Sequence, residues 1–167
     1  AELASQQGVK HFVFVSSVKA GGSTKLGYCM TEENQGSPEG VYGRTKREAE
    51  LRILEVGRQS SMSVSIVRSS LVYGPGVKGN FEKLIKLVGK GVPLPFAKMK
   101  NWRSVLAIDN LTDFIWTCIE KPKAKNETFL IADKDDVSTT GLLIAISEAY
   151  KKSLRLFYIP KTPLRWL

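Results

Sequence analysis

Apolar and polar residues alternate in blocks along the chain, and these blocks predict short strands alternating with amphipathic helices. Three short apolar runs are typical of buried strands, and they occupy residues 13–16, 63–67 and 128–131. Apolar residues at helical spacing predict helices over residues 41–59, 81–91, 110–120 and 139–152. Because a long helix separates the first two strands, we expect these strands to be parallel and joined by a right-handed crossover.

The segments between these elements also carry information. Residues 18–40 are rich in Gly, Ser, Thr and Asn, and they predict a long loop of the kind that is functional inside a compact domain. Residues 92–95 contain two prolines, so they predict an extended connection rather than a central strand. Shorter strands are expected at residues 103–108 and 155–159, and Asp109 is a candidate cap for the helix that follows it.

Composition and charge narrow the class of protein. The chain has 167 residues, of which 43% are hydrophobic, and a chain of this length can bury about 70% of its unfolded surface. No apolar run approaches the roughly 20 residues of a membrane span. The net charge is +9, but the basic residues are scattered rather than arranged in a stripe. We therefore expect no nucleic-acid partner.

Cysteine and histidine usage argues against a disulfide framework and against a zinc site. Cys29 and Cys118 are far apart in the sequence, a pattern that fits a reducing, cytoplasmic compartment. Cys118 lies in a predicted amphipathic helix and is expected in the core. His11 is the only histidine, so a zinc site is not expected, and we interpret His11 as structural.

The main chemical signal is a tyrosine and a lysine four residues apart. Tyr42 and Lys46 stand in the segment VYGRTKREAE, and this spacing puts them on one helix face. An ammonium beside a phenol favours the phenolate, which can then act as a general base. The strand-like run HFVFVSS ends in Ser17, whose hydroxyl can hold the alcohol being deprotonated. From spacing alone, a surface tyrosine and a solvated lysine are the stronger interpretation, so the surrounding residues must decide.

Four segments carry a family resemblance, and they are QQGVKHFVFVSSVK, TEENQGSPEGVYGRTKREAE, SIVRSSLVYGPGVKGNF and NWRSVLAIDNLTDFI. In this order they resemble the extended short-chain dehydrogenases/reductases. Within that group they resemble the NAD-dependent epimerase/dehydratase family, which includes UDP-glucose 4-epimerase. The matching segments run from about residue 6 to residue 160.

The resemblance implies an α/β fold, the C-terminal part of a Rossmann-type doubly wound parallel sheet plus a small α/β substrate-binding lobe. Residues 1–75 would form the second half of the NAD-binding Rossmann domain, and residues 76–167 mainly the substrate-binding lobe, interleaved with the sheet. The Gly-rich phosphate-binding turn of such domains is absent from this chain. Gly21 and Gly22 follow a strand and are interpreted as flexible linker. We therefore expect a fragment that lacks the N-terminal Gly-rich half and is inactive alone.

The resemblance also implies roles for residues of the site. Tyr42 would be the general acid/base at the sugar hydroxyl, Lys46 would also bind the nicotinamide ribose, and Ser17 would hydrogen-bond the reacting oxygen of the substrate. The residues implied to contact the cofactor are Ser16, Tyr42, Lys46, Arg68, Ser69 and Leu71. For Ser16, packing at the strand end is the stronger interpretation. After Arg68 it is the backbone that would flank the nicotinamide.

Two further residues are implied to bind the substrate. Arg103 matches an arginine that contacts the pyrophosphate of the nucleotide-sugar, a task suited to a permanently charged guanidinium. The alternative is a surface arginine on a strand edge. Asn80 stands where the family often has a polar contact to the nucleotide, and it could equally cap a helix that begins at residue 81.

The function implied is an NAD-dependent nucleotide-sugar 4-epimerase with hydride transfer at the sugar C4, in surface-polysaccharide metabolism. Leu71 stands where many epimerases of the family carry Asn, which favours a branch acting on UDP-N-acetylated or deoxy sugars. The same Ser-Tyr-Lys set also serves a nucleotide-sugar 4-keto reductase or dehydrogenase, and a non-catalytic dinucleotide-binding regulatory relative is a third interpretation. NADP in place of NAD stays open, and a homodimer through the Tyr42 helix is common among relatives.

Overall fold

A computed structural model describes residues 1–22, 29–33, 36–99 and 101–158 of the chain. The chain divides into two compact units. The first comprises Ala1–Val72 and Leu106–Ala132, and the second comprises Tyr73–Val105 and the described part of Asp133–Leu167. Within the described ranges, no helix is both long enough and apolar enough to cross a membrane.

A parallel three-stranded sheet forms the centre of the first unit. Its strands, in spatial order, are β1 (His11–Ser17), β2 (Ser63–Ser69) and β6 (Thr128–Ile131). Ser17 lies opposite Ser69, and Ser69 lies opposite Ile131, so all three strands end at the same edge of the sheet. β1 also includes His11, Phe12 and Ser17, and β2 also includes Arg68 and Ser69. All of these except Phe12 are polar, and an apolar pattern does not detect polar residues at strand ends.

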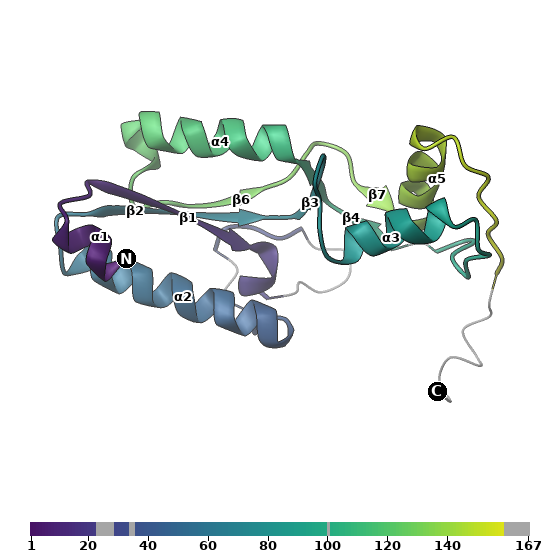
Figure 1. The fold of residues 1–167 in the computed structure, drawn as a ribbon. Coiled ribbons are helices and arrows are strands. Elements are labelled where there is room, and N and C mark those ends of the chain that lie inside the picture. The colour runs from purple at the N-terminus through teal and green to yellow at the C-terminus, as the bar shows by residue number, and fades with distance from the viewer. Residues whose placement is uncertain (23–28, 34–35, 100, 159–167) are drawn as a thin grey trace. The chain divides into compact units, whose positions relative to one another are not determined.

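Helices cover both faces of this sheet (Figure 1). On one face lie α1 (Glu2–Gln6) and α2 (Gly40–Arg58), and on the other lies α4 (Ile108–Glu120). Because α2 connects the parallel strands β1 and β2, the predicted strand–helix–strand crossover is present. The first unit is therefore an α/β structure of the expected class.

The central strand β2 supplies core residues to both faces of the sheet. Val64 and Ile66 pack with apolar residues of β1 and α2, whereas Val67 packs with Leu111 and Cys118 of α4. This alternation is the two-residue period of a strand that is buried on both sides. Cys118 is 1% exposed, so its predicted place in the core is confirmed.

The second unit contains two helices and short paired strands. The helices are α3 (Asn80–Gly89) and α5 (Thr139–Ala149), and β4 (Trp102–Arg103) pairs antiparallel with β7 (Val137–Ser138). The Ser138 hydroxyl accepts a hydrogen bond from the Gly141 amide at 2.9 Å. Ser138 is thus the N-cap of α5.

Four sequence predictions need correction. Residues 103–108 do not form one strand, because β4 ends at Arg103, β5 spans Val105–Ala107 and Ile108 already belongs to α4. Asp109 is consequently not a cap but a first-turn residue, where a carboxylate is favoured by the helix dipole.

The last two differences concern the C-terminal segments. The final helix, expected to reach Lys152, ends at Ala149, and Lys151 has a positive φ of 50° that no helix continues through. In place of a strand over residues 155–159, the described part of this segment forms one parallel bridge between Leu156 and Leu94. Ile159 lies outside the described residues.

Candidate active site

The start of α2 lies directly against the turn that follows β1. This turn is the short 3-10 helix η1 (Val18–Ala20), and its Lys19 carbonyl accepts a hydrogen bond from the Glu39 amide at 3.0 Å. A Cβ atom on Gly43 would lie 2.5 Å from the same carbonyl oxygen. Glycine therefore permits this approach, which brings Tyr42 to the end of β1.

Tyr42 and Lys46 share one face of α2, as their spacing predicts. The Lys46 Nζ atom lies 5.9 Å from the centroid of the Tyr42 ring and 4.9 Å from that of the Phe14 ring. The same ammonium donates a hydrogen bond to the Val15 carbonyl oxygen at 3.0 Å. Lys46 is thereby tied to β1, while Tyr42 is 55% exposed and accessible from solvent.

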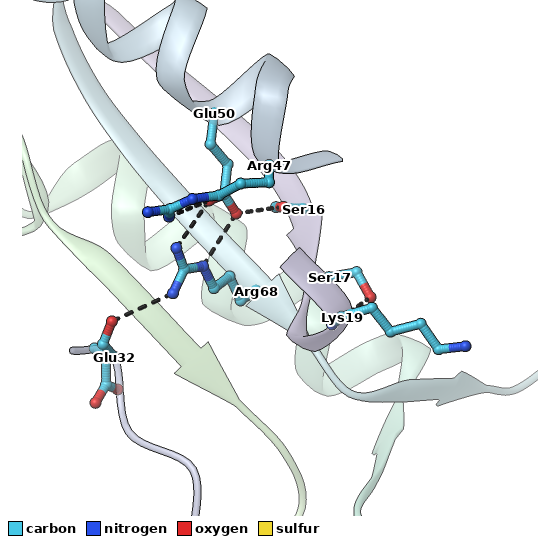
Figure 2. A network of polar contacts seen from close by, with 7 residues as sticks. All are labelled: Ser16, Ser17, Lys19, Glu32, Arg47, Glu50 and Arg68. Carbon is cyan, nitrogen blue, oxygen red and sulfur yellow. Dashed lines mark hydrogen bonds and ion pairs between the residues drawn. The ribbon is translucent and has the colours of Figure 1, made fainter. Parts of the chain in front are cut away.

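Ser17 ends β1 and supports the turn against which α2 begins. Its Oγ atom accepts a hydrogen bond from the Lys19 amide at 3.3 Å (Figure 2). Ser17 and η1 come from the strand side, and Tyr42 and Lys46 come from the helix side. The three residues predicted to be catalytic therefore belong to segments that meet at the carboxyl end of β1.

Ser16 and Arg68 belong to a buried polar group that we call the Glu50 cluster, formed by Ser16, Arg47, Glu50 and Arg68 (Figure 2). The Glu50 Oε1 atom accepts hydrogen bonds from Ser16 Oγ at 2.5 Å and from Arg68 Nε at 3.0 Å. Its Oε2 atom accepts from Arg47 Nη1 at 3.2 Å and from Arg68 Nη2 at 2.8 Å. The side chains of Ser16 and Arg68 are thus engaged within the protein.

The Glu50 carboxylate is kept ionised although it is buried. Burial by itself would raise the pKa of Glu50, but the hydrogen bonds from Arg68 and Ser16, the Arg68 charge and the hydrogen bond from Arg47 together outweigh it and lower the pKa. A forked guanidinium opposite a carboxylate is the geometry in which charge-assisted hydrogen bonds are strongest.

The backbone after Arg68 crosses the ends of the strands. Ser69 is buried and donates a hydrogen bond from its hydroxyl to the Ser16 carbonyl oxygen at 3.3 Å. The Ser70 amide donates to the Ile131 carbonyl oxygen at 3.1 Å. Leu71 then begins β3 (Leu71–Tyr73) and is partly buried.

The two predicted substrate contacts lie in the second unit. Arg103 is exposed on β4, opposite Val137 of β7. Asn80 is the first residue of α3, and Gly79 occupies the N-cap position. The interpretation of Asn80 as the cap of a helix from residue 81 is therefore wrong, because the helix starts one residue earlier.

Sequence reasoning missed Glu50, the residue around which the buried cluster is built. In the sequence it reads as an ordinary helix-surface glutamate, three residues after Arg47. A usable signal was its place four residues after Lys46, on the helix face that meets β1. Glu32 was missed likewise, although its carboxylate accepts a hydrogen bond from the Leu130 amide at 3.1 Å.

Comparison with known proteins connects this geometry with a family. The profile of the NAD dependent epimerase/dehydratase family matches residues 1–132. The UDP-glucose 4-epimerase of Vibrio cholerae is 46% identical over 155 residues, which cover 91% of this chain and 47% of that protein. The N-acetyl-alpha-D-glucosaminyl-diphospho-ditrans,octacis-undecaprenol 4-epimerase of Escherichia coli O157:H7 is 26% identical over 157 residues, which cover 93% of this chain and 47% of that protein.

Solved structures agree on the fold. The UDP-glucose 4-epimerase of Thermotoga maritima with UDP-glucose gives a TM-score of 0.77 at 23% identity, covering 96% of this chain and 54% of that chain. The UDP-glucuronic acid 4-epimerase of Bacillus cereus in complex with NAD gives 0.83 at 22% identity, covering 95% and 52%. These likenesses confirm the predicted Rossmann-type α/β fold.

The chain spans about half the length of the curated relatives it matches. The family profile nevertheless covers β1, α2, β2 and β6, which are the elements that carry the candidate site. The resemblance found in the sequence is thereby confirmed, and the chain belongs to the NAD dependent epimerase/dehydratase family.

Proposed function

We propose that the complete protein is an NAD-dependent nucleotide-sugar 4-epimerase that acts on UDP-glucose or a similar UDP-sugar. The observation that carries the proposal is the Lys46 ammonium, fixed to the Val15 carbonyl and lying beside the ring of exposed Tyr42. The 46% identity with the UDP-glucose 4-epimerase of Vibrio cholerae supports the reaction class.

The proposed chemistry is proton transfer at the sugar C4 hydroxyl. Tyr42, as phenolate, takes the hydroxyl proton and later returns it, which is general acid–base catalysis. Ser17 donates a hydrogen bond to the same oxygen and orients it. Lys46 stabilises the phenolate by its charge.

The side chains near the end of β1 include hydrogen-bond donors that could bind a dinucleotide. An ammonium has three N–H donors, and the Val15 carbonyl takes one from Lys46, so Lys46 can also donate to ribose hydroxyls. The chemistry that NAD supplies when bound is reversible hydride acceptance at the sugar carbon. Because the Ser16 and Arg68 side chains bind Glu50, we propose that the backbone of these residues, of Ser69 and of Leu71 faces the cofactor.

We propose a division of labour within the chain that follows its family membership. Residues 1–75 serve the cofactor and residues 76–167 mainly the nucleotide-sugar. In the second part the exposed Arg103 guanidinium suits the pyrophosphate, and Asn80 is proposed to contact the nucleotide. The proposal includes a homodimer through α2, a cytoplasmic location and a role in surface-polysaccharide metabolism.

The test is turnover by the complete protein with a panel of UDP-glucose, UDP-galactose and their N-acetylated forms. Interconversion of C4 epimers without net change in the absorbance of reduced cofactor supports the epimerase. Net oxidation or reduction of the cofactor would identify the reductase or dehydrogenase instead. No turnover despite bound NAD would favour a regulatory relative.

Tyr42→Phe is expected to abolish turnover while bound NAD is retained, because the phenol oxygen that carries the proton is lost. Tyr150→Phe is the matched control, since Tyr150 is also 55% exposed but lies in the second unit. Near-normal turnover of the Tyr42 variant, measured by epimer ratios over time, would refute the assignment.

A further inference from the structure

The Glu50 cluster lies one residue away from the predicted catalytic serine. Ser16 and Arg68 are partners in the register of β1 and β2, and the next pair is Ser17 and Ser69. Glu50 extends from α2 to the pair formed by Ser16 and Arg68. It accepts hydrogen bonds from Ser16 Oγ on β1 and from the Arg68 guanidinium on β2 (Figure 2). The cluster therefore joins helix and sheet immediately behind the site.

Glu50 continues the stripe of α2 that carries the site residues. Tyr42, Lys46 and Glu50 follow one another at four-residue steps, so they lie along one helix face. Lys46 bonds the carbonyl of Val15, and Glu50 bonds the hydroxyl of Ser16. Two successive turns of the helix are thus bonded to two successive residues of the strand, which fixes the helix along its own axis.

The bonding is directional, unlike apolar packing. Each Glu50 oxygen accepts two hydrogen bonds, and Arg68 supplies one to each oxygen in a forked arrangement. The Glu50 side chain is 1% exposed and that of Arg68 is 3% exposed. A buried ion pair contributes little net stability compared with apolar side chains of similar volume, but it fixes geometry when all its partners are satisfied.

Arg68 also bonds residues 29–33, a described part of the chain between Ser17 and Tyr42. Its Nη1 atom donates to the Glu32 carbonyl oxygen at 3.3 Å, and the Glu32 carboxylate accepts from the Leu130 amide at 3.1 Å. One guanidinium therefore contacts α2 and this segment from its place on β2. Arg68 thus bonds α2, which carries Tyr42 and Lys46, directly, and it is linked to β1 through Glu50 and Ser16.

We propose that Glu50 and Arg68 are positioning residues, which hold α2 in register with β1 so that Tyr42 and Lys46 stand beside Ser17. They act through the helix and do not contact the reacting atoms. The inference rests on the proposed function for its catalytic consequence, but its structural part concerns α2 alone.

The test replaces the ion pair by apolar side chains of similar volume, Glu50→Leu with Arg68→Met, in the complete protein. The double variant is expected to stay folded because the buried carboxylate and guanidinium are removed together, and the Arg47 side chain, which also bonds Glu50, is 23% exposed. Without the directional bonds, the start of α2 is no longer held at one position relative to β1, and Tyr42 is less often beside Ser17. We therefore expect kcat per bound NAD to fall between about 10- and 100-fold. The KM for the sugar is expected to stay within about two-fold of wild type, because the substrate contacts are untouched.

Hydrogen–deuterium exchange provides a readout that needs no activity. The amides of residues 40–46 are expected to exchange faster in the double variant, while β2 keeps its protection. Glu48→Gln is the matched control, since Glu48 pairs with Arg52 on the exposed side of the same helix. This control is expected to leave kcat and exchange unchanged.

The outcomes separate this inference from the proposed function. A folded double variant with wild-type kcat and wild-type exchange of residues 40–46 overturns the positioning role, whereas the proposed function stands. If the wild-type protein turns over no nucleotide-sugar, the proposed function fails, and the exchange comparison alone decides the positioning role. If the double variant does not fold, Arg68→Lys, which keeps the charge but loses the fork, is judged by the same two measurements.

Discussion

At the scale of single residues, the stability of the first unit depends on keeping Glu50 and Arg68 together. Glu50→Ala leaves the Arg68 guanidinium buried without its carboxylate, and the free energy of unfolding is expected to fall by about 3–5 kcal/mol. The exposed pair of Glu48 and Arg52 is expected to change it by less than about 1 kcal/mol when Glu48 is replaced. Urea unfolding measures both values, and equal effects would contradict the account.

The ion pair of Glu50 and Arg68 also makes the free energy of unfolding depend on pH in acidic solution. The pKa of Glu50 is lowered in the folded state, so the unfolded chain binds a proton at a higher pH than the folded one does. The stabilisation is present above the ordinary glutamate pKa of about 4.3 and is lost as the pH falls through the lowered folded value. The stabilisation is therefore complete at neutral pH, and only its pH dependence is confined to acidic solution.

His11 produces a second pH dependence, at higher pH. The Ser65 hydroxyl donates its only proton to the Ala124 carbonyl at 2.5 Å, so the 2.7 Å contact between His11 Nε2 and Ser65 Oγ requires a proton on Nε2. The buried Nδ1 atom, which has no hydrogen-bond partner in the described part of the chain, then carries the lone pair. Burial, and secondarily the charge of Lys125, lowers the pKa of His11.

We therefore expect the free energy of unfolding to be higher above the ordinary histidine pKa of about 6.5 and to decrease as the pH falls through the lowered folded pKa. Since the chain has one histidine, His11→Gln is expected to remove this step from the range that runs from neutral into mildly acidic pH. Urea unfolding of both proteins across that range measures it. A step that persists in the variant would exclude His11 as its source.

At the scale of elements, Gly43 sets the distance between α2 and β1. The Cβ of Gly43→Ala would meet the Lys19 carbonyl oxygen at 2.5 Å, so α2 must shift, with an expected cost of about 1–3 kcal/mol and a loss of kcat. Gly89→Ala is the control. Gly89 is the last residue of α3, and a Cβ atom added there would have no other atom within 4 Å. Thermal unfolding and turnover measure both, and a Gly43 variant as stable and active as wild type would contradict this packing.

The sequence predicted which helices and strands exist better than it predicted the residues at which they begin and end. Apolar periodicity located α2 and β6 to within one residue, because both bury a regular apolar face. It failed at residues 103–108, where three elements meet within six residues and no period can develop. For the site, Tyr42 and Lys46 were found by local spacing, whereas the burial of Glu50 depends on strands that are distant in sequence.

At the scale of the whole molecule, we interpret the sequence of 167 residues as lacking a Gly-rich phosphate-binding turn. A dinucleotide pyrophosphate needs the backbone amides of such a turn at a helix N-terminus. We expect this polypeptide alone to bind NAD weakly and to be inactive, although it carries Ser17, Tyr42 and Lys46. Calorimetry measures this directly, with the complete protein as the control, and micromolar affinity of the chain alone would contradict the expectation.

The carboxylate of Glu32 also affects an outer strand of the described parallel sheet. It accepts a hydrogen bond from the Leu130 amide of β6, which lies at the edge of that sheet. Unpaired donors along an outer strand invite a strand from another molecule, which is how native sheets begin to aggregate. Because the Glu32 carboxylate already accepts from the Leu130 amide, a strand from another molecule cannot pair with that donor without displacing Glu32.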